Sequence, residues 1–323
     1  MNYSNDFVVQ TKNLSKTFGN FQALNSVNLE VPKNSIFGFL GPNGAGKTTL
    51  MKILLGLNLP TNGSAKVFGF DIVKDSIAIR ERIGYLPQQP RFIEYMTARE
   101  NLLLSARFFY IGPKVKIKER CDEMLELVGL KDKADRPIKK FSVGEKQRLG
   151  IALAQVNYPD LLILDEPASS LDPIGRKEVF HVMEKLRKNT TIFFSTHILD
   201  DVQRICDSVA ILNQGKLLAC GPIHYLLDQK SGIEYLLTVY DKEKIMGKHL
   251  SGLEWVIQSE IIQKNSDGSI TWRIHLKDSA SAERQLLQLI QSDHRFVITE
   301  FSKQKTTLED VFMQIVKGVE YVH

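Results

Sequence analysis

The chain has 323 residues, of which 43% are hydrophobic and 24% charged, so its composition is that of an ordinary folded protein and excludes a disordered or collagen-like chain. Its 42 basic and 37 acidic residues give a net charge of +5, which is too small to indicate nucleic-acid binding by itself. No apolar run approaches the roughly 20 residues that span a bilayer, and we expect neither a secretory signal nor a membrane channel.

Strand and helix signals alternate through the first two-thirds of the chain. Apolar runs bounded by turn residues predict strands at residues 7–9, 27–31, 35–40, 161–164, 191–194 and 209–212. Apolar positions with a 3.6-residue period predict a helix from Thr48 to Leu57, and the segment from about 95 to 150 is mostly helical in pattern. Strands that alternate with helices are typical of an α/β fold, in which helices cover a parallel sheet.

The pattern changes near Gly221 and Pro222, and we place a domain boundary close to Asp228. Residues 1–227 would then form the α/β domain, and residues 228–323 would form a small α+β domain. In the second domain we expect strands at 235–240, 255–262, 269–276 and 296–301, a helix near 281–290, and a last helix that begins at Thr307.

A glycine-rich segment follows the strand predicted at residues 35–40. Residues 41–48 match the phosphate-loop pattern G-x-x-x-x-G-K-[ST], with a strand before them and a helix after them. In such a loop backbone N–H groups surround phosphate oxygens, while Lys47 would reach the β- and γ-phosphates and the Thr48 hydroxyl would bind Mg²⁺. The expected phosphate-binding residues are Gly41, Pro42, Asn43, Gly44, Ala45, Gly46, Lys47, Thr48 and Thr49.

Two acidic residues, Asp165 and Glu166, follow the apolar run at 161–164. In open α/β sheets ligands bind at the carboxyl ends of the strands, so these carboxylates would face the phosphate loop. Asp165 would then belong to the Mg²⁺ site, and Glu166 would act as the general base for the attacking water. An acidic pair after a strand is also compatible with a solvated turn, and the phosphate loop favours the functional interpretation.

Residues 141–148 add the most specific motif. This segment, Phe-Ser-Val-Gly-Glu-Lys-Gln-Arg, resembles the Leu-Ser-Gly-Gly-Gln signature of the nucleotide-binding subunits of ATP-binding cassette (ABC) transporters, and the resemblance covers about residues 7–227. It implies that Ser142 and Gly144 bind the γ-phosphate of an ATP held by the opposite subunit. Val143 replaces a glycine of the motif and Glu145 replaces its glutamine. Without this context, Ser142 would be interpreted as an ordinary helix N-cap.

Four further residues match family positions. The resemblance implies that Gln88 senses Mg²⁺, that Asp172 lies in a segment at the dimer interface, and that His197 contacts the γ-phosphate. Phe18 stands where the family stacks an aromatic ring on adenine, although a phenylalanine is also compatible with a core position.

The carboxyl-terminal part narrows the subfamily. Residues 306–312 resemble a closing motif of ABC-2-type export ATPases, which include antibiotic-resistance proteins. From the residues alone, Thr307 caps a helix whose apolar face contains Leu308, Val311, Phe312 and Ile315. The resemblance as a whole implies a P-loop NTPase cassette with a mixed sheet, a helical subdomain at about 89–150, and a small α+β domain after it.

The resemblance also implies cofactors and partners. We expect an ATPase that uses ATP and Mg²⁺, pairs with a second copy or a paralogue, and drives a separate transmembrane permease from the cytoplasmic face of the cell membrane, with no nucleic acid as partner. An apolar patch that includes Phe92, Tyr95 and Phe109 would receive the permease, and these side chains are equally compatible with the core of the helical insert.

Two alternatives stay open at this point. A soluble ABC ATPase that acts on ribosomes or DNA would normally have two cassettes or long coiled coils, whereas this chain has one cassette and no sustained heptads. A regulatory cassette with weak hydrolysis is disfavoured by the presence of Lys47, Asp165, Glu166 and His197.

Overall fold

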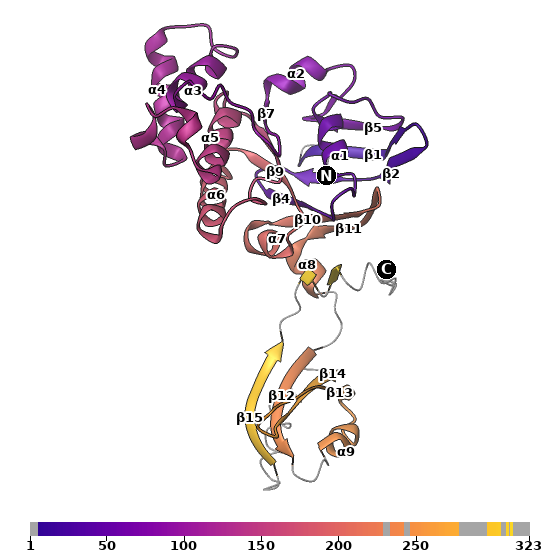
Figure 1. Ribbon diagram of the computed structural model, residues 1–323. Helices are drawn as coiled ribbons and strands as arrows, with labels where there is room; N and C mark the ends of the chain where they lie inside the picture. Colours follow the sequence, from indigo (N-terminus) through magenta and orange to yellow (C-terminus); the bar gives the residue numbers. More distant parts are fainter. Residues whose placement is uncertain are drawn as a thin grey trace. The chain divides into compact units, whose positions relative to one another are not determined.

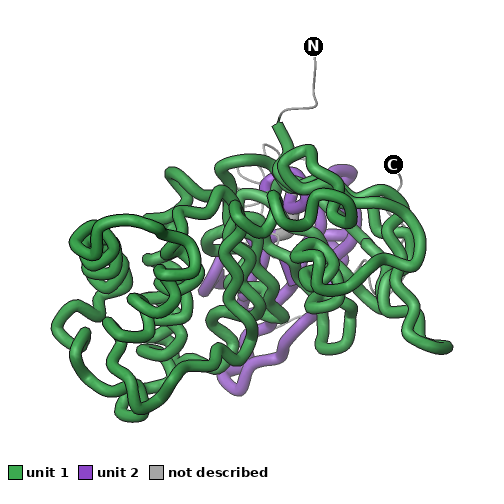
Figure 2. Tube along the Cα trace, turned by 90° about the horizontal axis from the view of Figure 1, so that it is seen from above, with its two compact units in different colours: residues 1–223, 315–323 green, residues 224–314 purple. Residues whose placement is uncertain are grey.

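The chain divides into two units in the computed structural model, which describes residues 6–228, 233–241, 246–277, 296–304, 308–309 and 311–312. The first unit contains residues 6–223, and the second contains the described residues between 224 and 314 (Figure 2). The division between Ile223 and His224 falls a few residues before the boundary that the sequence indicates near Asp228.

A six-stranded sheet forms the centre of the first unit. Its strands are β4 (Ile36–Leu40), β7 (Ile83–Leu86), β8 (Leu161–Asp165), β9 (Thr191–Thr196), β10 (Ser208–Asn213) and β11 (Lys216–Pro222), in the order β11-β10-β4-β9-β8-β7. Every residue of β4, β8 and β9 is buried, which explains their nearly continuous apolar sequences. The pairs from β10 to β7 are parallel and β11 is antiparallel to β10, so the sheet is mixed, as predicted.

The first unit also contains an antiparallel sheet. Its strands are β1 (Phe7–Phe18), β2 (Phe21–Val27), β3 (Glu30–Pro32), β5 (Asn62–Val67) and β6 (Phe70–Asp71). Figure 1 shows β1, β2 and β5 at the end of the unit opposite α3 and α4. The single strand predicted at residues 27–31 is not found, because β2 ends at Val27 and β3 covers Glu30–Pro32. Strands β5 and β6 have no clear sequence signal, because β5 begins with exposed polar residues and has no clear apolar alternation.

Helices flank the mixed sheet. In residues 6–222 they are α1 (Lys47–Leu54), α2 (Ser76–Glu81), α3 (Ala98–Ala106), α4 (Lys114–Leu127), α5 (Val143–Gln155), α6 (Pro173–Leu186) and α7 (Leu199–Ile205). The short helix α8 (Ile223–Asp228) begins at the last residue of the first unit and belongs otherwise to the second. Leu102, Met124 and Leu149 belong to the same buried cluster as Leu164 of β8, so the helical insert shares a core with the sheet. Among the described residues, each helix is too short or too polar to cross a bilayer.

The second unit contains a four-stranded antiparallel sheet. Its elements are β12 (Ile233–Asp241), α9 (Met246–Ser251), β13 (Val256–Lys264), β14 (Ile270–Leu276) and β15 (Phe296–Gln304), with the strand order β13-β14-β12-β15. Alternate residues of β14 are buried, as expected for a sheet with one apolar face. The helix predicted near 281–290 lies outside the described residues, as do Thr307 and Ile315 of the last predicted helix; Leu308 and Val311 are described and buried.

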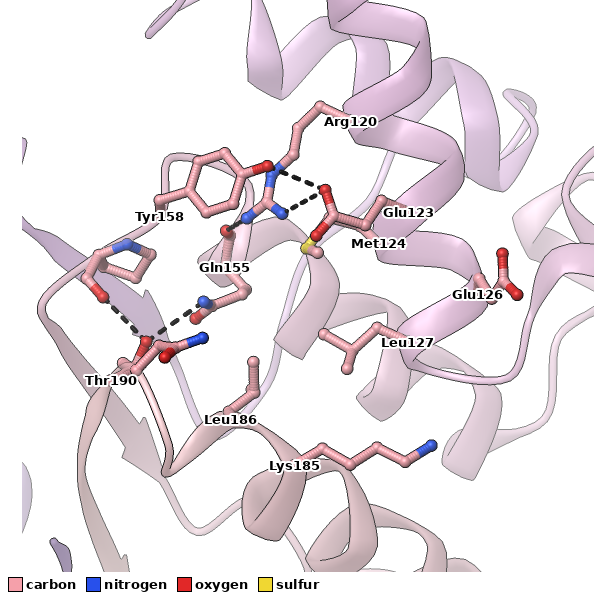
Figure 3. A pocket seen from close by; sticks show the side chains of 12 residues that line it. Arg120, Glu123, Met124, Glu126, Leu127, Gln155, Tyr158, Lys185, Leu186 and Thr190 are labelled. Atoms are coloured by element: carbon pink, nitrogen blue, oxygen red, sulfur yellow. Dashed lines mark hydrogen bonds and ion pairs between the residues drawn. The ribbon is translucent and has the colours of Figure 1, made fainter. Parts of the chain in front are cut away.

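Arg120 of α4 closes the carboxyl end of α5 (Figure 3). Its Nε donates to the carbonyl oxygen of Val156 at 3.0 Å, and its Nη2 donates to that of Gln155 at 2.6 Å. Its Nη1 lies 2.8 Å from Glu123 Oε2, and the guanidinium carbon lies 3.2 Å from the centre of the Tyr158 ring. The last carbonyl groups of a helix have no partner within it, so a cation with several donors stabilises this end. Arg120 therefore ties the helical insert to the residues that lead into β8.

The Arg120 side chain also borders a pocket of about 380 Å³ that includes Met124, Gln155, Leu186 and Thr190 (Figure 3). Thr190 Oγ1 donates to the carbonyl oxygen of Pro159 at 3.1 Å, just before β8 begins. The pocket thus lies at the amino end of β8. Ligands of parallel sheets bind at the carboxyl ends of strands, so we assign this pocket no part in nucleotide binding.

We expect Arg120→Met to lower the free energy of unfolding by about 2–4 kcal/mol, because two buried carbonyl groups lose a charged donor. Denaturant titration measures this change. Lys131→Gln is the matched control, because Lys131 forms an exposed pair with Glu126 at 2.9 Å and its loss should leave stability nearly unchanged. Equal effects of the two substitutions would contradict a structural role for Arg120.

Candidate functional site

The phosphate loop connects β4 to α1, as the sequence predicted. Gly44 and Gly46 have φ angles of 80° and 109°, in the region that favours glycine. A Cβ atom at Gly46 would lie 2.5 Å from the carbonyl oxygen of Ala23, and one at Gly41 would lie 2.3 Å from that of Leu212. The backbone approaches its neighbours so closely that other residues would displace the loop.

Lys47 is buried and folds back over this loop. Its Nζ donates to the carbonyl oxygen of Gly41 at 2.7 Å and to that of Pro42 at 3.2 Å. It also lies 3.4 Å from Glu166 Oε1. An ammonium group needs such oxygen partners when it is removed from water. The side chain is thus held at the mouth of the loop, beside the acidic end of β8.

Asp165, the last residue of β8, is held by two hydroxyl groups. Thr48 Oγ1 donates to its Oδ2 at 2.9 Å, and Ser195 Oγ donates to its Oδ1 at 2.6 Å. Ser195 Oγ also accepts a hydrogen bond from the Glu166 N–H at 2.9 Å, so one hydroxyl of β9 fixes both acidic residues. Burial, together with the negative charge of Asp165, raises the pKa of Tyr85 to about 12.

Three of the predicted site residues, Lys47, Gln88 and His197, surround the carboxylate of Glu166. Its Oε2 lies 3.3 Å from Gln88 Nε2 and 3.3 Å from His197 Nδ1, and its Oε1 faces Lys47. Its φ angle is 50°, a left-handed conformation that is uncommon for residues other than glycine and recurs at functional sites. Because Glu166 is only 8% exposed, the solvated-turn interpretation does not describe this acidic pair.

The residues proposed for Mg²⁺ offer the right kind of ligand. The Thr48 hydroxyl and an Asp165 carboxylate oxygen lie 2.9 Å apart, and Gln88, which also has an amide oxygen, lines the same pocket as Thr48. Mg²⁺ prefers oxygen ligands and commonly takes one or two carboxylates with phosphate oxygens. The donor set therefore fits Mg²⁺.

A pocket of about 470 Å³ opens over the phosphate loop. Its lining includes Phe21, which no motif of the sequence marks as a site residue. Phe18 and Phe21 are directly opposed in the β1–β2 hairpin, so their side chains lie on the same face. Phe18 is 47% exposed, which excludes the core position considered from the sequence, and Lys16 Nζ lies 4.8 Å from the centre of its ring. The full lining is Phe21, Ala23, Asn43, Gly44, Ala45, Gly46, Lys47, Thr48, Thr49, Gln88 and Glu166.

The predicted signature segment begins α5. Ser142 is the N-cap: its hydroxyl accepts from the Glu145 N–H at 3.2 Å, and its own N–H donates to Glu145 Oε2 at 2.9 Å. Burial opposes ionisation of Glu145, but hydrogen bonds from Lys133, at 2.5 Å, and from the Ser142 N–H outweigh it and lower its pKa. The acidic residue that departs from the family motif thus completes a capping box.

Asp172 lies beside the signature segment. It caps α6, since its Oδ1 accepts from the Gly175 N–H at 2.8 Å. Asp172, Ser142 and Gly144 line one pocket of about 280 Å³, together with Val143, Glu145, Arg148, Ser170, Leu171, Ile174, Gly175 and Glu178. Among the described residues this pocket shares no lining residue with the pocket over the phosphate loop. The predicted site residues therefore fall into two groups within one chain.

Two family models match the sequence. Residues 24–169 match the model described as ABC transporter. Residues 237–316 match the model described as ATP-binding protein DrrA1-3-like, C-terminal domain.

Relatives match almost the whole chain. The bacitracin transport ATP-binding protein BcrA of Bacillus licheniformis is 36% identical over 314 residues, which cover 96% of this chain and 98% of that protein. The uncharacterized ABC transporter ATP-binding protein YxlF of Bacillus subtilis is 37% identical over 309 residues, which cover 96% of this chain and 99% of that protein.

Solved structures match the cassette. CbiO1 of Clostridium perfringens, part of the ABC transporter complex CbiONQ, is 28% identical in sequence and matches with a TM-score of 0.65. The match covers 70% of this chain and 92% of the CbiO1 chain. A dimeric post-hydrolysis structure of the ATP-binding cassette MJ0796, bound to ADP and Pi, is 27% identical with a TM-score of 0.61 and covers 67% of this chain and 98% of its own. The chain therefore belongs to the ABC transporter ATP-binding proteins and is an ATPase subunit of that family.

Proposed function

We propose that the chain hydrolyses ATP at the interface of two opposed subunits, and that closure of this dimer drives export through a separate transmembrane permease. The observation that carries the proposal is the convergence of Lys47, Gln88 and His197 on the buried carboxylate of Glu166. Nearly full-length similarity to transport ATP-binding proteins favours a transporter over an ABC ATPase that acts on ribosomes or DNA.

The polar residues around Glu166 have distinct roles in this proposal. Glu166 takes a proton from the attacking water, while Lys47 and His197 contact the γ-phosphate. Mg²⁺ held by Thr48, Asp165 and Gln88 would supply Lewis-acid stabilisation of charge on the phosphate oxygens. Because the acid, the lysine and the histidine are all within contact distance, the arrangement favours hydrolysis over a purely regulatory cassette.

The pocket over the phosphate loop and the pocket of the signature segment suggest how two chains complete each site. The phosphate loop of one chain would hold the nucleotide, and Ser142 and Gly144 of the opposite chain would bind its γ-phosphate through a hydroxyl and the N–H groups at a helix N-terminus. The capping box occupies the Ser142 N–H and leaves its O–H free to donate. ATP would then stabilise the closed dimer only while the γ-phosphate is present, since a ligand shifts an equilibrium through differential affinity.

An exposed apolar surface of the helical insert is suited to the permease. Phe92 packs against the buried core, whereas Tyr95 and Phe109 are exposed, together with Phe108 and Ile111 in the loop after α3. Exposed apolar groups of this size commonly mark interaction sites. We assign Tyr95, Phe108, Phe109 and Ile111 to permease docking, which would hold the chain at the cytoplasmic face of the membrane.

The transported substrate would contact the permease. BcrA is named for bacitracin transport, and the carboxyl-terminal similarity to DrrA1-3-like proteins accords with an ABC-2-type exporter. A bacitracin-like peptide antibiotic is therefore the first substrate that we propose to test with the reconstituted complex.

Replacing the general base separates binding from hydrolysis. We expect Glu166→Gln to lower the ATPase rate by about a hundredfold or more, while ATP-dependent dimerisation persists. Phosphate release and light scattering measure the two effects. Glu184→Gln, on the exposed side of α6, is the control and should retain wild-type turnover. Normal hydrolysis by Glu166→Gln, or an inactive wild type in the presence of its permease, would refute the proposal.

The two aromatic residues of the hairpin would form the adenine platform. We expect Phe21→Ala and Phe18→Ala each to raise the KM for ATP by roughly three- to tenfold, because stacking is lost. Binding of inorganic tripolyphosphate, which has no base, should be unchanged and serves as the control. If the double variant leaves the KM for ATP unchanged, adenine does not stack on this hairpin.

Polar residues in the proposed docking surface should release the permease. We expect Phe108→Ser and Ile111→Ser to abolish co-purification of a multi-span membrane protein from detergent-solubilised membranes, without altering ATP binding by the isolated chain. Ile77→Ser replaces an exposed apolar residue of α2, outside this surface, and should leave co-purification intact. Unaltered capture by the first two variants would place the docking surface elsewhere.

A further inference from the structure

His197 is held through both of its neighbours along the chain. The carbonyl oxygen of Thr196 accepts from the N–H of Gly41, the first residue of the phosphate loop, at 3.2 Å. The N–H of Ile198 donates to Thr196 Oγ1 at 3.0 Å. These two bonds fix the backbone on either side of the histidine, and the orientation of its ring depends on them.

The Thr196 hydroxyl contacts an ion pair whose carboxylate is buried. Thr196 Oγ1 donates to Asp201 Oδ2 at 3.5 Å, a long hydrogen bond, and Arg176 Nη2 donates to Asp201 Oδ1. Asp201 is only 3% exposed and lies in the first turn of α7, where a negative charge is favourable. Burial raises the pKa of Asp201, and the hydrogen bond from Arg176 offsets part of this effect. A buried carboxylate in this position requires its cation.

Arg176 belongs to the first turns of α6, which begins at the Asp172 cap. The Arg176 N–H donates to the carbonyl oxygen of Asp172 at 2.9 Å, and Asp172 Oδ1 holds the Gly175 N–H. Asp172 also lines the pocket of the signature segment. A continuous series of contacts therefore runs from the signature pocket through Arg176 and Asp201 to the backbone around His197.

We propose that Arg176 and Asp201 are positioning residues that hold His197 beside Glu166. Through their contacts, the position of Asp172 at the start of α6 would determine where His197 lies. This inference rests on the proposed function, because it assumes that His197 acts in hydrolysis. Neither residue contacts the pocket over the phosphate loop, so they act through the Thr196–Ile198 segment. In a dimer whose interface includes Asp172, closure of the dimer would therefore change the position of His197 in the same chain.

The geometry predicts a loss in turnover without a loss in binding. The phosphate loop keeps its own contacts when the ion pair is removed, so ATP affinity should stay near the wild-type value, whereas a displaced histidine slows the chemical step. Misplacement of a reacting group by about 1 Å costs up to on the order of a hundredfold in rate. A purely stabilising ion pair would instead lower the melting temperature and leave the turnover of the folded protein unchanged.

The test uses the full chain with four substitutions: Asp201→Asn, Arg176→Lys, the double variant Arg176→Gln with Asp201→Asn, and Arg187→Gln. The double variant removes both charges together, so it leaves no unpaired buried carboxylate if a single variant unfolds. Arg187→Gln is the matched control, because Arg187 forms the 2.6 Å pair with Asp207 from the other end of α6. The kcat and KM for ATP, the Kd of a non-hydrolysable ATP analogue, and the melting temperature are measured for each.

We expect Asp201→Asn and the double variant to lose on the order of tenfold or more in kcat with the analogue Kd unchanged, and Arg176→Lys to retain most of the turnover. Turnover of the double variant equal to that of Arg187→Gln would overturn the positioning role. A parallel measurement of Glu166→Gln separates the two proposals: if Glu166→Gln is inactive and the double variant is fully active, only the positioning role fails. If Glu166→Gln hydrolyses ATP normally, the proposed function itself fails.

Discussion

The buried pairing of Lys47 with Glu166 is the constraint around which the site is arranged. A buried carboxylate and a buried ammonium are costly to remove from water, and this cost is offset only when each has well-placed partners. Lys47 finds carbonyl oxygens of the phosphate loop, and Glu166 finds Gln88 and His197. The strand order β4-β9-β8 makes this possible, because adjacent parallel strands deliver the loop, the histidine and the acids to one edge.

Glu166 also shows how local backbone strain and sheet register combine. Its left-handed conformation turns the chain at the end of β8, and the bond from its N–H to Ser195 fixes that turn. Asp165 and Ser195 are paired in the β8–β9 register, so the hydroxyl that holds both acids is placed by the sheet itself. The strained turn persists because its surroundings determine it from two strands.

Much of this arrangement could be predicted from the sequence because it depends on local patterns. The phosphate loop has fixed spacing, and the strands β4, β8 and β9 contain short apolar runs, so the residues alone predict both. The roles of Ser195 and Phe21 cannot be predicted in this way. They depend on which residues of two paired strands lie opposite each other, and this register has no periodic signal along the chain. The ion pair of Arg176 with Asp201 joins two helices that are separate in sequence, so no local pattern predicts it either. Strand β5 also lacks a sequence signal, because its first residues are polar and exposed.

The signature helix α5 links these features to the dimer. Its 13 residues correspond to about 20 Å of helix, with Arg120 bound at the carboxyl end and Ser142 at the amino end. A rotation of about 10° around the end held by Arg120 would move Ser142 by roughly 3 Å, the length of a hydrogen bond. If Ser142 binds a phosphate held by an opposite chain, as proposed, that contact would be sensitive to how firmly α4 holds the far end of α5. The position of Ser142 in the pocket of the signature segment would thus depend on Arg120, a cation bound at the opposite end of the same helix.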